Sequence, residues 1–223
     1  MKRIVVFAAL ALAAWLPAQV ATQANSKYQT PEDRQKMAKN LANPGRDQSQ
    51  KPGQLMFQMG LQPGMTVADV GTGVGHLLPF LSHRVGDKGH VIAEDIFDDF
   101  LAAARQTAAD EKLANVTFVK GEETDPKLPE AGVDMVLAFD VYHHFDYPEK
   151  MLAGIHKALR ADGKLVVVEY YKREAAMPNG NALTHIRLDM PDLIKELEAN
   201  HFHLIEERER IKNVEYMLIL EKS

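Results

Sequence analysis

The stretch Val67-Ala-Asp-Val-Gly-Thr-Gly-Val-Gly75 decides the fold of this chain, because it joins an apolar strand to a glycine turn and then to a helix. Residues 65–70 are alternately and then continuously apolar, which is typical of a central strand covered by helices on both faces. The three glycines at alternate positions lack Cβ atoms, so the backbone can take positive φ values and a ligand can approach it closely. Apolar spacing resumes at Leu77, which predicts a helix with Pro79 in its first turn.

A glycine turn at the carboxyl end of the first strand of a doubly wound sheet is typical of a site for a nucleotide-like ligand. The spacing excludes two familiar variants. A dinucleotide-binding turn has its third glycine three residues after the second, where this chain has His76. A phosphate-binding loop would continue with Gly-Lys-Ser/Thr, which is absent after the turn. Asp69, two residues before the first glycine, would repel a phosphate and attract a cation.

With that acid and those glycines, residues 67–75 resemble motif I of the class I S-adenosylmethionine-dependent methyltransferases. In that family the glycine turn lies against the methionine part of the cofactor, and the nearby acid helps to hold its ammonium side. The resemblance extends from about Gly53 to the C-terminus. It implies S-adenosylmethionine as the cofactor, with these candidate contacts in the turn: Asp69, Gly71, Thr72, Gly73 and Gly75.

An acidic pair, Glu94-Asp95, closes a second predicted strand at residues 90–93. An acid about 20 residues beyond the glycine turn typically ends the next strand and bonds the ribose hydroxyls. A carboxylate can accept both hydrogen bonds of a vicinal diol. We favour Asp95, because Asp95-Ile96 matches the family pattern, and keep Glu94 as the alternative.

The adenine contact is expected after the third predicted strand, residues 116–119. In the resembled family an acid that follows a glycine here contacts the adenine amino group. This chain has Glu122 where Asp is commoner, and a further acid at Asp125. Both remain candidates.

A second cluster of chemically capable side chains, residues 140–145, follows the fourth predicted strand at residues 133–139. Residues at the carboxyl end of such a strand line the ligand crevice, so we expect Asp140 on the cofactor side. A general base is needed only for a weakly acidic acceptor, and imidazoles titrate near neutral pH. The catalytic candidates are Tyr142, His143, His144 and His185. Asp140 and His144 could equally shape the loop through hydrogen bonds.

We expect no resident metal, because no His-x-x-x-His pattern with nearby acids is evident, although Asp140 with His143 could coordinate an ion. The methyl acceptor and the atom that would be methylated stay open.

The remaining patterns predict the rest of an α/β fold. It is a doubly wound, mostly parallel seven-stranded sheet with helices on both faces and an antiparallel C-terminal hairpin. A helix with Asp98 as its cap follows at residues 98–113, and another at residues 148–159 ends at a Gly163 C-cap signal. A turn is expected at residues 178–180. The other expected elements are a strand at 165–168, a helix at 191–199 and hairpin strands at 202–206 and 214–220.

The N-terminus follows a different pattern. Lys2 and Arg3 precede an apolar run at residues 4–16 and then small and polar residues, which is typical of a secretory signal peptide over residues 1–24, cleaved near Ala24 or Ala21. A short uncleaved membrane anchor is the alternative, although the run is shorter than the about 20 apolar residues of an ordinary span. Residues 25–52 form a polar lead-in segment, and residues 53–223 form the methyltransferase domain.

Cleavage would leave 24 basic against 31 acidic residues, which argues against nucleic acid as a partner. We therefore expect an exported, periplasmic or secreted, enzyme that acts on a small-molecule acceptor. A Rossmann-type oxidoreductase is disfavoured by the glycine spacing. An exported, non-catalytic nucleoside-binding protein that keeps the fold remains the alternative, because S-adenosylmethionine is made in the cytoplasm.

Overall fold

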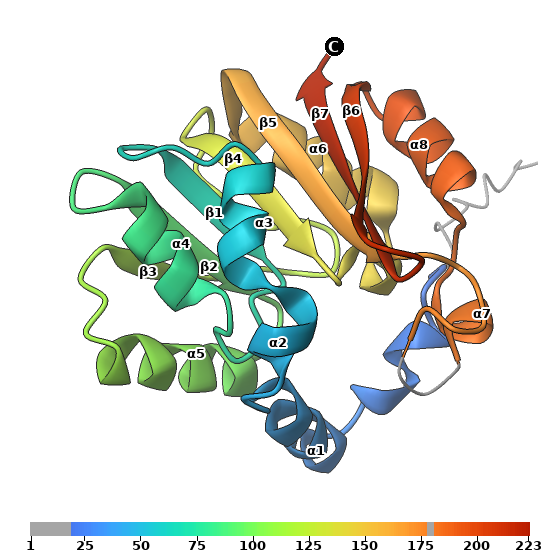
Figure 1. Ribbon diagram of the computed structural model, residues 1–223, viewed down its shortest axis with the longest axis horizontal. Coiled ribbons are helices and arrows are strands. Elements are labelled where there is room, and N and C mark those ends of the chain that lie inside the picture. The colour runs from blue at the N-terminus through green and yellow to red at the C-terminus, as the bar shows by residue number, and fades with distance from the viewer. Residues whose placement is uncertain (1–18, 178–180) are drawn as a thin grey trace, which may run out of the picture.

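A single mixed sheet forms the centre of the computed structural model, which describes residues 19–177 and 181–223. Its strands are β1 (Thr66–Val70), β2 (His90–Asp95), β3 (Val116–Lys120), β4 (Val133–Phe139), β5 (Leu159–Tyr170), β6 (Phe202–Ile211) and β7 (Glu215–Lys222). They lie in the order β3-β2-β1-β4-β5-β7-β6 (Figure 1). Only β7 runs against the others, pairing antiparallel with both β5 and β6. The predicted fold class is confirmed.

Helices cover both faces of this sheet because its strands are apolar on both sides. The helical elements are η1 (Ala24–Lys27), α1 (Pro31–Leu41), α2 (Arg46–Gln50), α3 (Pro52–Gln58), α4 (Leu78–Val85), α5 (Asp98–Asp110), η2 (Tyr142–His144), α6 (Pro148–Ala158), α7 (Ala182–His185) and α8 (Met190–Ala199). Alternate residues of β1 separate the two layers, because strand side chains point to opposite faces. Val67 packs with α3 and α4, and Ala68 packs with α6 and α8.

The chain reverses its direction of progress across the sheet between β1 and β4. From β1 it proceeds to β2 and β3 on one side, and then to β4 and β5 on the other. Ligands of doubly wound proteins bind beyond the carboxyl ends of the strands at such a switch point. The glycine turn follows β1 and the loop at Asp140 follows β4, so the topology brings the two sequence clusters together.

Two predicted helix signals are wrong. Asp98 is the first residue of α5 and not its cap, because Phe97 occupies the cap position. The backbone N–H of Phe97 donates a hydrogen bond to Asp95 Oδ1. The Gly163 signal does not end a helix either. Helix α6 stops at Ala158 and β5 begins at the next residue. Gly163 lies inside β5, where the pairing with β4 shifts register between Val133 and Met135.

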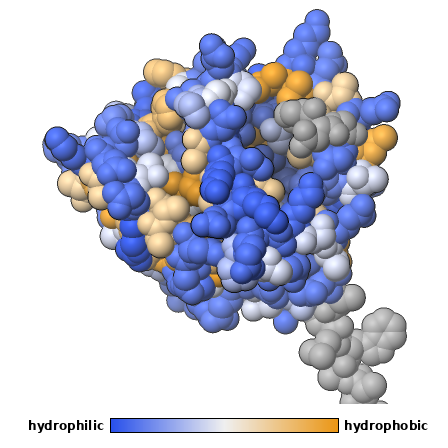
Figure 2. All heavy atoms as spheres, turned by 90° about the horizontal axis from the view of Figure 1, so that it is seen from below, coloured by the Kyte–Doolittle hydropathy of each residue, from blue (hydrophilic) through white to orange (hydrophobic). Residues whose placement is uncertain are grey.

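The lead-in segment is more ordered than a solvated linker. It forms η1, α1 and α2, and it passes below the carboxyl edge of the parallel strands, where α1 packs against α5 (Figure 1). This face of the molecule is predominantly hydrophilic when viewed from below (Figure 2). Most of the predicted signal segment and the predicted turn at residues 178–180 lie outside the described residues. Within the described residues, no helix has the length and apolar character needed to cross a bilayer.

Candidate functional site

A cavity of about 890 Å³ lies between the switch point of the sheet and the lead-in segment. Its floor is the glycine turn after β1, and one side is the end of β2. The opposite side is the loop that contains η2, and the roof comes from η1 and α1. The cavity therefore collects most of the residues that the sequence singled out, from elements far apart in the chain.

The three glycines of the turn have positive φ values but different surroundings. A Cβ at Gly71 would collide with Val141, so glycine lets the turns after β1 and β4 pack together. Gly73 faces the cavity, where a Cβ would meet only Leu41 of the roof at 3.3 Å. Gly75 packs against α5, with a Cβ position 3.1 Å from Cα of Ala104. Gly71 and Gly73 line the cavity, whereas Gly75 supports the turn from behind.

Both acids at the end of β2 are tied to this turn. Glu94 Oε2 accepts a hydrogen bond from the Gly71 N–H at 3.2 Å, and Asp95 Oδ2 accepts one from the Gly73 N–H at 2.9 Å. Burial raises the pKa of Asp95 to about 6 and that of Glu94 well above its usual range. Glu94 Oε1 is buried without a hydrogen-bond partner among the described residues. The two residues line the same cavity, so the predicted choice of Asp95 over Glu94 stays a prediction.

Asp69 sits beneath the turn and is almost completely buried. Its Oδ2 accepts a hydrogen bond from the Thr72 hydroxyl at 2.8 Å, and both residues line the cavity. Burial raises the pKa of Asp69 to about 7, although the bond from Thr72 works in the opposite direction. A cation bound here would favour the charged form of the carboxylate.

Asp140 follows β4 in a strained conformation, with φ 53°. A positive φ is uncommon for a residue with a Cβ, and such strain often marks a functional site. Its carboxylate lines the cavity, and burial raises its pKa despite the nearby His143. Asp140 is thus one of several acidic residues that line this cavity, together with Asp69, Glu94 and Asp95.

The two candidates for the adenine contact are separated by the structure. Glu122 lines the cavity. Asp125 points elsewhere, because its Oδ1 accepts from the Lys127 N–H at 2.8 Å and its Oδ2 pairs with the Lys127 ammonium at 3.2 Å. The geometry thus leaves Glu122 as the better placed of the two.

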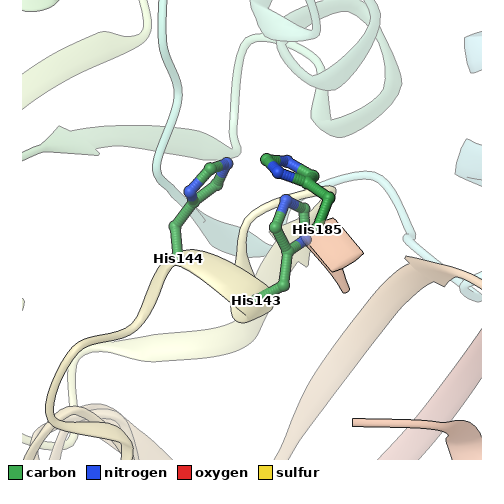
Figure 3. A group of neighbouring side chains, drawn as sticks. All are labelled: His143, His144 and His185. Atoms are coloured by element: carbon green, nitrogen blue, oxygen red, sulfur yellow. The ribbon is translucent and has the colours of Figure 1, made fainter. Parts of the chain in front are cut away.

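The predicted catalytic histidines meet at the far side of the cavity (Figure 3). The ring centroids of His143 and His144 are 4.1 Å apart, and those of His143 and His185 are 4.8 Å apart. Burial lowers the pKa of His143, but Glu169 beside it more than offsets this, so its pKa is raised. Burial and the neighbouring imidazoles lower the pKa of His144 well below its usual range and that of His185 to about 4. His144 and His185 are therefore neutral at pH 7.

Tyr142 does not join this cluster. Its hydroxyl donates to Glu196 Oε1 of α8 at 2.7 Å, on the other side of η2 from the histidines. Burial, with Glu196 beside it, raises its pKa. Tyr142 lies outside the cavity lining, so its role is to hold η2 against α8.

Sequence reasoning did not single out Asn25 and Tyr28, two residues of the roof. Asn25 donates from Nδ2 to Asp146 Oδ2 at 2.9 Å and to the His144 carbonyl at 3.0 Å. Tyr28 stacks on Phe97 with ring centroids 6.3 Å apart and meets His144 edge-on at 4.9 Å. Arg46 is a cation on the cavity wall. A polar segment has no periodic apolar pattern from which its contacts could be predicted. The aromatic and Arg residues within it are the only sequence features that could have indicated a role at the cavity.

The arrangement combines a wall for a nucleoside-like cation with an opposite wall of three imidazoles, of which His144 and His185 are neutral. The fold and the cavity define a doubly wound α/β protein with a nucleoside-type cofactor site at its switch point. A family model described as "Methyltransferase domain" matches residues 61–220. The chain therefore belongs to the class I S-adenosylmethionine-dependent methyltransferases.

Individual relatives agree with this assignment. The chain is 34% identical over 115 residues to the ubiquinone/menaquinone biosynthesis C-methyltransferase UbiE of Shewanella sp. (strain W3-18-1). That match covers 51% of this chain and 45% of the relative, so the chain spans less than half the length of the curated relatives it matches. A crystal structure of a SAM-dependent methyltransferase from Aquifex aeolicus is 26% identical with a TM-score of 0.78, covering 84% of this chain and 98% of that one.

A third comparison concerns the fold alone. The [4+2]-cyclase SpnF superimposes with a TM-score of 0.64 at 16% identity, covering 76% of this chain and 80% of that one. That protein is named a cyclase, so the shared fold does not fix the reaction.

Proposed function

We propose that this protein transfers the methyl group of S-adenosylmethionine to a small-molecule acceptor. The observation that carries the proposal is the shared cavity, in which the glycine turn and Asp95 face the histidines His143, His144 and His185. A cofactor held by the first wall would present its methyl group to an acceptor held near the second. Bound S-adenosylmethionine would supply a methyl group on a sulfonium; on attack by the acceptor atom the carbon–sulfur bond would break, and sulfur would keep the electron pair as a thioether.

The described residues fit the charges of this cofactor. Its sulfonium and ammonium groups are positive, and acidic residues that include Asp69, Glu94, Asp95 and Asp140 line the cavity. Its carboxylate is negative, and the cation Arg46 also lines the cavity, where its charge partly offsets the burial that raises the pKa values of Asp69 and Asp140. Asp95 is proposed to hold the ribose, Glu122 the adenine, and the glycine turn the methionine part, which its backbone can approach closely because Gly73 has no Cβ. Holding two reactants in line can supply about 7–11 kcal/mol of the barrier.

The histidines are proposed to act on the acceptor. A neutral imidazole can accept a proton from a hydroxyl acceptor as its oxygen attacks, and a base of this kind adds about 10²–10⁴-fold. His144 and His185 are neutral at pH 7 because of their lowered pKa values. The UbiE relatives are named for quinone biosynthesis, so phenolic and quinol-type molecules are the first acceptors to test.

Calorimetric titration with S-adenosylmethionine and with its demethylated product tests the cofactor half of the proposal. Gly73→Val should abolish binding, because the branched side chain would enter the cavity beside Leu41. Gly60→Val is the control for the backbone strain that a valine causes at a positive φ, because Gly60 also has a positive φ, 73°, and open space around it. Unchanged affinity in Gly73→Val, or an equal loss in Gly60→Val, would place the site elsewhere. NAD(H) should not bind.

The second candidate function is a non-catalytic nucleoside-binding protein. It is favoured by the predicted export signal, because the cofactor is made in the cytoplasm. The two functions differ in one measurement, the formation of demethylated product from methyl-labelled cofactor in the presence of an acceptor panel. Tight binding without any label transfer over a broad panel would favour the binding protein.

A further inference from the structure

Three imidazoles converge at the cavity wall although they come from two separate segments. His143 and His144 are consecutive residues of η2, and His185 is the last residue of α7. Their rings lean toward one another (Figure 3), and one ring nitrogen of each lies within 4.8 Å of the others. Sequence spacing gave no sign of this cluster, because 40 residues separate its two halves.

Two of the three rings are held by partners on their outer nitrogens. His143 Nδ1 lies 2.9 Å from both carboxylate oxygens of Glu169, and both side chains are buried. Since a carboxylate only accepts, Nδ1 carries the proton and donates it.

His144 is held in the same way by the roof. Its Nδ1 lies 2.8 Å from Asn25 Oδ1. The amide orientation of Asn25 is fixed, because its Nδ2 donates to Asp146 and to the His144 carbonyl. His144 Nδ1 is therefore also a donor. In neutral rings this leaves a lone pair on Nε2 of both residues, and neither Nε2 has a hydrogen-bond partner among the described residues.

Oriented imidazoles with free Nε2 lone pairs are metal ligands. In protein metal sites, a ligating histidine almost always donates its other ring N–H to a carboxylate or amide-type oxygen, which fixes its tautomer and orientation. Three imidazoles suit zinc and other late first-row ions, and binding of the ion releases any proton held on Nε2 of His143. A packed aromatic cluster would need no such carboxylate, and burying an unneeded Glu169 would be costly.

We propose that His143, His144 and His185 bind one divalent transition-metal ion, with Glu169 and Asn25 as its outer partners. While the ion is bound, these imidazoles act on the acceptor through the ion and no longer accept its proton themselves. Zinc bonds imidazole nitrogen at about 2.0–2.1 Å, so nitrogens around a tetrahedral ion lie about 3.3 Å apart. The rings close on the ion by small side-chain rotations. The fourth position opens into the cavity, where it takes an oxygen ligand from water or an acceptor.

The alternative group, Asp140 with His143 and Glu169, is less suitable. Glu169 already uses both oxygens on His143 Nδ1, so it would have to give up that contact to ligate an ion.

Zinc titration of the chelator-treated full-length protein tests the site without any measurement of methyl transfer. We expect one equivalent by elemental analysis, and a midpoint of thermal unfolding that rises with zinc concentration because the ion binds only the folded state. Cobalt(II) as a second probe should give the visible absorption of a low-symmetry nitrogen-ligated ion. A wild-type protein with less than half an equivalent and no zinc-dependent shift overturns the proposal.

Variants assign the ligands. Glu169→Gln removes the charge but keeps the shape, and should weaken zinc binding by about 10–100-fold. His185→Ala should weaken it further. His203→Ala is the matched control, since His203 is an exposed residue of β6 and should leave zinc binding unchanged. Full zinc affinity in His185→Ala, or an equal loss in His203→Ala, also overturns the proposal. Circular dichroism shows whether each variant is folded, and the wild-type titration stands even if one is not.

Discussion

At the scale of single residues, the end of β2 carries the clearest test of the cofactor site. Asp95→Ala should weaken binding of S-adenosylmethionine by roughly 10- to 150-fold, the equivalent of about 1.5–3 kcal/mol for lost charge-assisted hydrogen bonds. Asp95→Asn keeps one acceptor oxygen and should lose less. Calorimetry on both variants measures the difference.

Glu94→Gln is the control for this pair. Gln keeps the shape of Glu94 and an acceptor oxygen for the Gly71 N–H, so the bond to the turn is retained. Its affinity should therefore change little. A large loss in Glu94→Gln together with none in Asp95→Ala would make Glu94 the ribose ligand.

Asp69 should make the ligand-free protein less stable as pH rises. Its pKa of about 7 in the folded protein exceeds the ordinary value of about 3.9. Between these values the folded state holds a proton that the unfolded state has lost, so the free energy of unfolding falls with pH, by at most on the order of 4 kcal/mol. Asp69→Asn keeps an acceptor for the Thr72 hydroxyl and should remove the contribution of Asp69 to the fall of the free energy of unfolding with pH. Urea unfolding of the wild type and of the variant at pH 5 and pH 8 measures this contribution. If the free energy of unfolding changes equally with pH in both proteins, the raised pKa of Asp69 is refuted.

At the scale of elements, a buried ion pair joins the C-terminal hairpin to the lead-in segment. Arg210 Nε donates to Glu215 Oε2 at 2.8 Å, and its Nη1 donates to the carbonyl of Gln50 at the end of α2. Both side chains are buried, so Arg210→Ala would leave a carboxylate without its partner, at a cost of about 3–5 kcal/mol. Chemical denaturation measures this loss. The exposed pair of Lys195 and Asp192 is the control, and Lys195→Ala should change stability by less than about 1 kcal/mol.

Elements with a strong periodic pattern could be predicted closely, and elements fixed by tertiary contacts could not. Strand β4 has the predicted bounds, residues 133–139, because its run of apolar residues is buried on both faces. Strand β5 begins six residues before the predicted one, since Leu159 pairs with Val133 across a register shift that no local pattern shows. Likewise, the hydrogen bond from the Phe97 N–H to Asp95 fixes Phe97 at the cap position of α5, although Asp98 has the higher intrinsic preference for that position.

In the candidate site, too, residues in a local motif could be predicted and residues placed by tertiary contacts could not. The motif around Gly73 predicted its place in the cavity, because a glycine turn after a strand is a local feature. The meeting of His185 with His143 and Glu169 depends on how α7 returns to the sheet. Tyr142 was expected beside the histidines, but the rotation of η2 sends its hydroxyl to α8.

At the scale of the whole molecule, we propose that the protein is exported. Residues 1–24 have a basic start, an apolar run and small residues at the end. N-terminal sequencing of protein made in a bacterial host should begin near Asn25. Cleavage there would remove the bond from the Ala21 N–H to Asp146 and keep both donor bonds of Asn25, so the roof should persist. Soluble cytoplasmic protein that retains Met1 would contradict export.

The roof over the cavity has a consequence for the timing of the reaction. Bound product is covered by η1 and α1, whose contacts with the domain include the stack of Tyr28 on Phe97 and the bonds around Asp146. A molecule that leaves past this segment would require it to lift, and such motions occur on the scale of microseconds to milliseconds. The residence time of the product, and with it the maximal turnover number, would then be governed by a polar stretch far from the glycine turn in sequence.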